Sequence, residues 1–495
     1  MQKKTIPQQE STLKSLKKKF TFKSKYGSRK FICISLIIFF TVYIFTVLRG
    51  LEYSILVPKL GAEIISAIEL CCLLPASSFF VVLYFKLGKH FSRINIAQML
   101  LVSFIVFFYI FNLFVFPFHE NLIFNLSTYK DQYPRLKYPI MLVENWDITL
   151  FYVISELWGI MMLNLSFWQM ANEISTVSEA KKFYGFFGAL GQSGNIAGGW
   201  AAVKIGKFYP TTLDDAWILR FDWLLNSVTL SGIVLLICYW WIAKNVWPYV
   251  RIEERKSIKI KLSLKESFRY IFTSRYLRLV STLIICYGVL ISISETLWKD
   301  QVNKLHTNSA DYSAFMGKYQ MYLGIGAVTG SLVGVATLKR FSWLFNALST
   351  PMCFLFGGVI FLSLITFRES LEPVFDFFGI PVIVASVTAG MYQIILAKSF
   401  KYSLFDLSKE VTFIPLDEEL RTNGKAAVDI ISNRIGRSGG SVIILTLLTL
   451  MPSSNLLSLS GYLFIVFLSF LVLWLYAAIA LNTEFEKVAR ENQSS

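Results

Sequence analysis

Long apolar runs recur along this chain from residue 31 to residue 481, and they are its most constraining feature. Many of them reach about 18 residues or more, the length at which an α-helix crosses the hydrocarbon core of a bilayer. Strands of a membrane barrel would be only about 10 residues long and would alternate apolar with polar residues. Charged residues make up 16% of the chain, against roughly a quarter in soluble domains. The sequence therefore predicts an all-α, polytopic membrane protein.

The runs fall into two sets of six, so we expect about 12 transmembrane helices in two six-helix halves, the architecture of many secondary transporters. The expected spans are residues 31–57, 64–87, 94–118, 151–182, 183–205 and 217–247, then 279–298, 316–338, 345–367, 380–400, 435–451 and 457–481. The fourth stretch is expected to leave the membrane near Asn172. The predicted organisation is a basic arm (1–30), an N-terminal half (31–247), a basic linker (248–278), a C-terminal half (279–481) and a tail (482–495).

The positive charge of the chain is unevenly distributed. The formal net charge is +16, and most of the excess lies in the arm and the linker. Basic loops remain in the cytoplasm, so we expect both termini on the cytoplasmic side of the membrane. The arm can also contact anionic lipid headgroups. The charge has this topological explanation and does not indicate a nucleic-acid partner. No cleavable signal peptide is evident, because the first apolar run is too long and has no small-residue cleavage site.

One acid stands out in the fourth stretch. Glu156 follows an apolar sequence and has no nearby countercharge along the chain. An ionisable side chain inside a membrane costs a few kcal/mol, so it is a candidate functional residue. The alternative is a structural acid that bonds to another helix.

Further charged residues lie in other spans. Arg49 and Glu52 are three residues apart and share one helix face, and Glu295 and Lys299 are four apart, a spacing that allows pairing. The second pair could instead be a surface pair near the outer boundary. After the tenth span we expect a cytoplasmic rim, formed by Lys398, Lys401, Asp406, Lys409 and Glu410.

A second basic group precedes and enters the eleventh span. Lys425, Asp429 and Arg437 can lie along one approach to that helix. Cations in a wet cavity suit a phosphate-bearing solute, because a bare polyanion cannot cross a low-dielectric core. The alternative is ordinary positive charge flanking a membrane helix.

Other site chemistries find no support in the sequence. The six cysteines lie in apolar runs without metal-type spacing, and the three histidines are expected in loops. No G-x-x-x-x-G-K-[ST] motif is present, and the glycine clusters of the fifth and eighth spans are typical of helix packing. We therefore expect neither an enzyme nor a bound cofactor or metal.

Several blocks of the sequence resemble the ATP/ADP translocase (nucleotide transporter) family of intracellular bacteria and plastids. The blocks are LRGLEYSILVPKLGAEIIS, NWDITLFYVISELWG, FWQMANEISTVSEAKKFYGFFG, CYGVLISISETLWK and KYSLFDLSKEVTFIPLDEELRTNGKAAVDII, followed by GRSGGS. They extend from the first span to the eleventh. The resemblance implies major-facilitator-like helices and nucleotide transport across the inner membrane.

The resemblance also implies site residues. The acid of the E-L-W motif falls on Glu156, and the acid before T-L-W-K falls on Glu295, with Lys299 after it. The lysine of G-K-A-A-V-D falls on Lys425, and the basic position before S-G-G falls on Arg437.

The chain departs from the family pattern in the first span. Where an L-R-x-x-K-D pattern is expected, this chain has Glu52 and Tyr53. A buried acid can carry a proton, which would support proton-coupled uptake. It could equally suit a less negative substrate such as a dinucleotide.

These observations predict a secondary transporter that exchanges nucleotides of the ATP/ADP type by alternating access. Phosphates would contact Lys299, Lys425, Arg437 and Arg49. Glu156 and Glu295 would pair with these cations when the site is empty, or would contact the base or ribose. Glu52 and Asp429 are candidates for coupling. Proton-coupled nucleoside triphosphate uptake and NAD/ADP-type exchange are the alternatives, and a channel is the competing class. We expect a monomer that meets only its nucleotide, protons and the bilayer.

Overall fold

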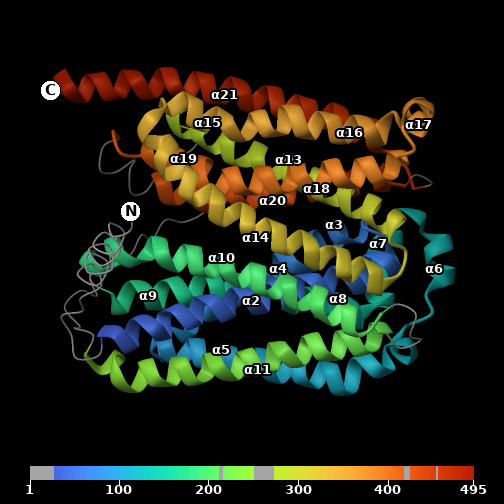
Figure 1. Cartoon of the computed structure of the whole chain (residues 1–495), viewed down its shortest axis with the longest axis horizontal. Helices are drawn as coiled ribbons and strands as arrows, with labels where there is room; N and C mark the ends of the chain where they lie inside the picture. The colour runs from blue at the N-terminus through green and yellow to red at the C-terminus, as the bar shows by residue number, and fades with distance from the viewer. Residues whose placement is uncertain are drawn as a thin grey trace, which may run out of the picture.

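The structure is a computed structural model and describes residues 27–175, 177–210, 216–249, 273–416, 424–452 and 455–494. Most of the predicted basic arm and linker therefore lie outside the described residues. The described part is a bundle of long helices that run parallel to one axis of the molecule (Figure 1).

Six membrane-length segments form the first half. They are α2 (Gly27–Leu60); α3 (Ile64–Ile68), η1 (Glu69–Leu73) and α4 (Leu74–Leu87); α5 (Arg93–Ile110), η2 (Phe111–Val115) and η3 (Phe116–Leu122); α8 (Trp146–Trp158), η5 (Gly159–Phe167) and α9 (Trp168–Ile174); α10 (Val177–Phe208); and α11 (Ala216–Asn245). Short elements connect or follow them: α6 (Ser127–Gln132), η4 (Pro134–Leu136), α7 (Lys137–Glu144) and η6 (Trp247–Tyr249).

Six more segments form the second half. They are α13 (Arg275–Leu305); α14 (Ser309–Arg340); α15 (Trp343–Cys353), η8 (Phe354–Gly358) and α16 (Val359–Thr366); α18 (Val382–Phe400), η9 (Lys401–Phe405) and α19 (Asp406–Thr412); α20 (Lys425–Leu450); and α21 (Ser460–Ser494). The short helix α17 (Arg368–Phe377) lies between the third and fourth of them.

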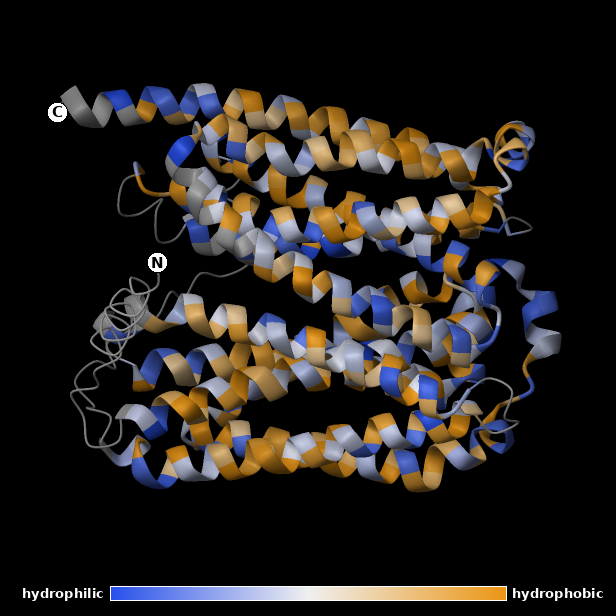
Figure 2. Cartoon of the chain, viewed as in Figure 1, coloured by the Kyte–Doolittle hydropathy of each residue, from blue (hydrophilic) through white to orange (hydrophobic). Residues whose placement is uncertain are grey.

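Within the described residues, nine of these segments are long and apolar enough to cross a membrane. The helices α10, α14 and α20 carry more glycine and charged residues, but with 32, 32 and 26 residues they are also long enough. In Figure 2 apolar residues cover much of α11 and α21, while hydrophilic residues gather at the two ends of the bundle. The predicted all-α architecture of two six-helix halves is confirmed.

Several helices extend beyond the predicted spans. The fourth segment begins at Trp146, α13 continues to Leu305, and α20 already begins at Lys425. The tenth segment does not end near residue 400, because the wide π-helical turn η9 leads directly into α19. Residues expected in a rim after that segment therefore belong to a helix.

Buried tryptophans fix the helices that carry the central charges. The indole of Trp158 donates to the carbonyl oxygen of Thr41 at 3.0 Å and ties α8 to α2. In the other half, Trp298 donates to the carbonyl oxygen of Val387 at 2.9 Å and ties α13 to α18. The first and fourth segments of each half are thus joined by a buried hydrogen bond.

The two halves meet along two seams. The helix α14 packs against α10 and α2, and α20 packs against α3 and η1 (Figure 1). At the first seam, Gly199 lies against the backbone of Gly317 and Met321. Only glycine lets helices approach this closely, since a Cβ on Gly199 would lie 2.5 Å from the carbonyl oxygen of Gly317.

Candidate functional site

Charged side chains from both halves converge between the helices. They come from the first and fourth segments of each half: α2 and α8, and α13 and α18. These are the helices that the buried tryptophans join, so the charged residues stand on a rigid frame. The predicted residues Arg49, Glu52, Glu156, Glu295 and Lys299 all belong to this group.

The first-half pair joins α2 to α8. Arg49 Nε lies 3.0 Å from Glu156 Oε1, and the two side chains are 25% and 5% exposed. The guanidinium of Arg49 also lies over the ring of Phe45, 5.0 Å from its centroid. The carboxylate that lacked a countercharge along the sequence therefore has one on a neighbouring helix.

In the second-half pair, the acid is on the first segment and the cation is on the fourth. Glu295 is on the first segment of that half, and its Oε1 lies 2.5 Å from Lys398 Nζ on the fourth segment. Lys398 also donates to the hydroxyl of Tyr319 at 3.2 Å. The prediction that Lys398 belongs to a cytoplasmic rim was wrong, because its side chain is largely buried beside Glu295.

Lys299 connects the two pairs. Its Nζ lies 3.7 Å from Glu295 Oε2 within the second half and 3.7 Å from the centroid of the Tyr53 ring in the first half. Lys299 is 4% exposed, so the alternative of a surface pair is excluded. A buried ammonium on an aromatic face is a favourable cation–π contact, and here it crosses the boundary between the halves.

Glu52 is buried beside these charges. It is 1% exposed, no described donor group bonds to its carboxylate oxygens, and its carboxyl interacts directly with the carboxyl of Glu156. It interacts electrostatically with Glu156, Arg49 and Lys299. Two carboxyl groups therefore lie next to each other between the cations of the site.

Arg437 reaches the same region from the eleventh segment. It interacts electrostatically with Glu156 and with Glu69 of η1. Glu69 accepts a hydrogen bond from Ser441 Oγ at 2.5 Å, which joins the first half to α20. The prediction did not include Glu69, which lies one helical turn after the expected start of its span.

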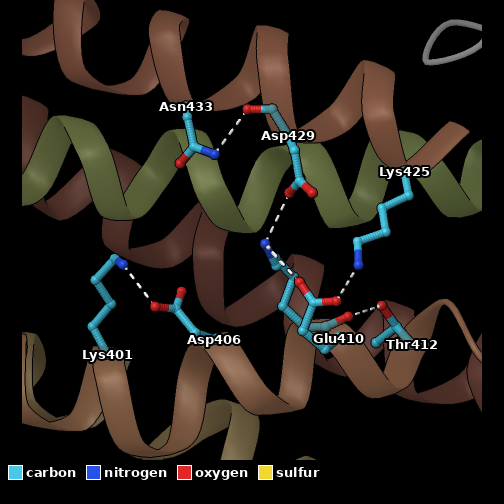
Figure 3. Close-up of polar contacts among 8 residues, drawn as sticks. Lys401, Asp406, Glu410, Thr412, Lys425, Asp429 and Asn433 are labelled. Carbon is cyan, nitrogen blue, oxygen red and sulfur yellow. Dashed lines mark hydrogen bonds and ion pairs between the residues drawn. The ribbon is translucent and has the colours of Figure 1, made fainter. Parts of the chain in front are cut away.

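Lys425 and Asp429 lie in a second cluster, shown in Figure 3. Lys409 Nζ lies 2.8 Å from Asp429 Oδ1 and 3.3 Å from Glu410 Oε1, and Lys425 bonds to Glu410. Lys425 and Arg437 are twelve residues apart on one helix, a distance of about 18 Å at 1.5 Å per residue. The structure therefore separates Lys425 and Asp429 from the other predicted residues.

The central cluster suits a polyanionic ligand. Arg49, Lys299 and Lys398 each lie near a carboxylate, and Arg437 interacts electrostatically with Glu156 and Glu69. A phosphate chain offers several oxygens that can replace those carboxylates, and arginine binds phosphate through paired hydrogen bonds. In the described part of the chain, no group of three His, Cys, Asp or Glu side chains is close enough to hold a metal ion.

Solved structures of membrane transporters share the fold of this chain. The nucleoside transporter NupG, solved as a mutant, matches with a TM-score of 0.60 at 11% identity over 91% of this chain and 99% of that chain. A bacterial homologue of the iron transporter ferroportin in an inward-facing state matches with a TM-score of 0.54 at 14% identity over 93% and 98% of the two chains. The fold is that of a multi-pass membrane transporter with two helical halves.

Sequence comparison narrows the class to one family. A family model described as "TLC ATP/ADP transporter" matches residues 6–485, and the chain belongs to this family. The ADP,ATP carrier protein 1 of Chlamydia pneumoniae is 34% identical over 92% of this chain and 91% of its own length. The ADP,ATP carrier protein 1 of Rickettsia typhi is 33% identical over 98% of this chain and 99% of its own length. The predicted family is confirmed.

Proposed function

We propose that this chain exchanges adenine nucleotides, ATP against ADP, by alternating access of its two halves. The central observation is the cluster of paired charges between the halves, with the cations Arg49, Lys299, Lys398 and Arg437. The names of the relatives support the substrate, since they are called ADP,ATP carriers.

In this proposal the acids hold the cations ready. Glu156 pairs with Arg49, and Glu295 pairs with Lys398 and Lys299, until phosphate oxygens take their place. The buried cations are then never left without a counterion, which would be costly. Lys299 contacts both halves, so its transfer from Tyr53 and Glu295 to a phosphate changes the contacts between them and couples binding to rocking.

We place the carrier in the cell inner membrane with both termini in the cytoplasm. The basic arm 1–30 and the basic linker 248–278 favour this orientation. In Figure 1, α2 begins and α21 ends at the same end of the bundle, and α20 also begins there. Lys425 and Asp429 would then stand at the cytoplasmic mouth, where Lys425 can meet a phosphate on its way to the centre. The carrier would act as a monomer within the bilayer.

Glu52 supports a second candidate, proton-coupled uptake of a nucleotide. Its carboxyl is buried and interacts directly with the carboxyl of Glu156. Two adjacent carboxyl groups in a low-dielectric site favour retention of a proton on one of them. The same acid would also suit NAD/ADP exchange, since a dinucleotide carries fewer charges on its phosphates.

Uptake of labelled ATP into vesicles that contain the purified carrier tests these proposals. Internal ADP should stimulate uptake, external ADP and ATP should compete, and a protonophore should have no effect. A channel would show no stimulation by internal nucleotide, proton coupling would show loss of uptake with the protonophore, and dinucleotide exchange would show competition by NAD.

Three variants test the assigned residues. Glu156→Gln, Lys299→Gln and Lys425→Ala should each reduce exchange at least about tenfold while the protein still inserts, because each loses a charge-assisted contact. Glu144→Gln is the matched control. Glu144 Oε2 lies 2.7 Å from Lys130 Nζ, and this ion pair belongs to neither cluster. Normal exchange by all three site variants would refute the assignment.

A further inference from the structure

The Glu69–Ser441 hydrogen bond is both a bridge between the halves and a neighbour of the phosphate-binding cations. Ser441 Oγ lies 2.5 Å from Glu69 Oε2. Glu69 belongs to the first half through η1, and Ser441 belongs to the second half through α20. A bond of this kind must break whenever η1 and α20 separate.

The serine is held firmly in place. Ser441 is buried, and α20 lies directly on α13 because Gly436 meets the backbone of Ile284 and Ile285. The Ser441 hydroxyl therefore cannot follow Glu69 if η1 moves away, and the bond reports the distance between the halves.

Glu69 also faces the cations of the central site. It interacts electrostatically with Lys299 and Arg437, and with the acid Glu156. Arg437 and Ser441 are four residues apart on α20 and so lie on one helix face. A phosphate bound to Lys299 and Arg437 would place negative charge beside the Glu69 carboxylate and would take away the attraction that holds it there.

Other contacts between the halves also lie toward the end of the bundle at which α14 begins, but away from the charges of the central site. The buried guanidinium of Arg220 donates to the carbonyl oxygens of Gly206 and Tyr209 on its own half and of Ala310 on the other half. Gly199 packs against Gly317 at the α10–α14 seam. These contacts help to hold the two halves together at this end. Glu69 also holds the halves together, and in addition it lies beside the cations of the central site.

We propose that Glu69 is a positioning residue that makes transport an obligatory exchange, an inference that rests on the proposed nucleotide exchange. In the empty carrier, Glu69 holds η1 to Ser441, so the carrier cannot reopen at this end without cargo. A bound nucleotide draws Lys299 and Arg437 away from Glu69 and repels its carboxylate, and the halves separate. A carrier that has released its substrate at the opposite end therefore stays closed at this end until a counter-nucleotide binds.

The test compares uptake into vesicles with and without internal ADP. Wild type should show strong stimulation by internal ADP and little uptake without it. Ser441→Ala removes the bridge and leaves every charge of the site, and Glu69→Gln removes the charge. Each should raise uptake into ADP-free vesicles roughly tenfold or more, since the lost hydrogen bond is to a charged, buried group. With internal ADP, exchange by Ser441→Ala should stay within about twofold of wild type, so that a folding defect is distinguished from lost coupling.

A matched serine control is available on α21. Ser469 donates to the carbonyl oxygen of Ile465 in its own helix, so Ser469→Ala should keep the wild-type dependence on internal ADP. The inference is overturned if Ser441→Ala and Glu69→Gln both retain that dependence. If wild type itself shows no stimulation by internal ADP, the proposed exchange fails, and this result is distinct from the first.

Discussion

The Arg49–Glu156 pair makes a quantitative prediction about nucleotide affinity. If Arg49 binds phosphate, the nucleotide must first displace Glu156 from it, and removal of the acid should tighten binding. Loss of one partner from a fully buried ion pair costs about 3–5 kcal/mol. Glu156 is buried here but Arg49 is 25% exposed, so we take about 2 kcal/mol as the contribution of the pair. This corresponds to a roughly 30-fold change in the dissociation constant.

The assay is equilibrium binding of labelled ADP to four purified proteins: wild type, Glu156→Gln, Arg49→Gln and the double variant. Glu156→Gln should bind ADP about 10- to 30-fold more tightly than wild type. It should still transport poorly, because ADP then leaves slowly and no acid replaces it on Arg49. Arg49→Gln should bind ADP weakly, and the added Glu156→Gln change should then have little effect.

Two results would refute this reasoning. Equal tightening by Glu156→Gln with and without Arg49 would show that the acid acts on the substrate directly. Weaker binding by Glu156→Gln alone would show that the carboxylate itself contacts the nucleotide, through its base or ribose. Glu144→Gln should leave the dissociation constant unchanged, since its partner Lys130 lies outside the site.

Two further predictions concern stability. Gly199→Ala should destabilise the protein by about 1–3 kcal/mol through overpacking at the α10–α14 seam and so lower its thermal midpoint in detergent. Gly185→Ala is the control and should not lower the midpoint, because the space around Gly185 is open. Equal midpoints for the two variants would contradict close packing at the seam. Burial lowers the pKa of His306, just beyond the end of α13, below its ordinary value of 6.5. At low pH the folded state then binds fewer protons than the unfolded state. The contribution of the neutral His306 to the free energy of unfolding is therefore present in full above about pH 6.5, and it is lost as the pH falls through the folded pKa. His306→Gln should therefore lose less thermal stability than wild type between pH 7.5 and 5.5, and parallel losses would rule the histidine out.

The fold was predictable because membrane helices must satisfy their backbone groups within one segment, which leaves long apolar runs in the sequence. The central charges were also visible, since an acid such as Glu156 is rare in such a run. Their partners were not, because the Arg49–Glu156 and Glu295–Lys398 pairs join helices that are far apart in sequence. Helical spacing detects neighbours only within one helix, as it did for Glu295 and Lys299.

The predicted end of the tenth helix, near residue 400, coincides with the π-helical segment η9. A π turn accommodates one extra residue and rotates everything beyond it relative to a regular α-helix. The segment η9 begins at Lys401, directly after the helical turn that carries Lys398, and η1 begins at Glu69. The charged residues from Lys398 onward led to a predicted end that is too early, because η9 continues the helix into α19, whereas the start of the span that contains Glu69 was predicted correctly at Ile64. The eleventh span was predicted to begin at residue 435, ten residues too late, because α20 already begins at Lys425.

The glycine seam between α10 and α14 restricts how this carrier can change over evolution. Main chain rests on main chain at Gly199 and Gly317, and the side chain nearest to Gly317 is only the methyl group of Ala202, so little side chain at the junction could be trimmed to adjust the fit. Any enlargement on one helix has to be matched by a reduction on the other, and the two helices must therefore diversify together. In the proposed mechanism substrate preference depends on charges elsewhere, so it can change while this junction stays fixed.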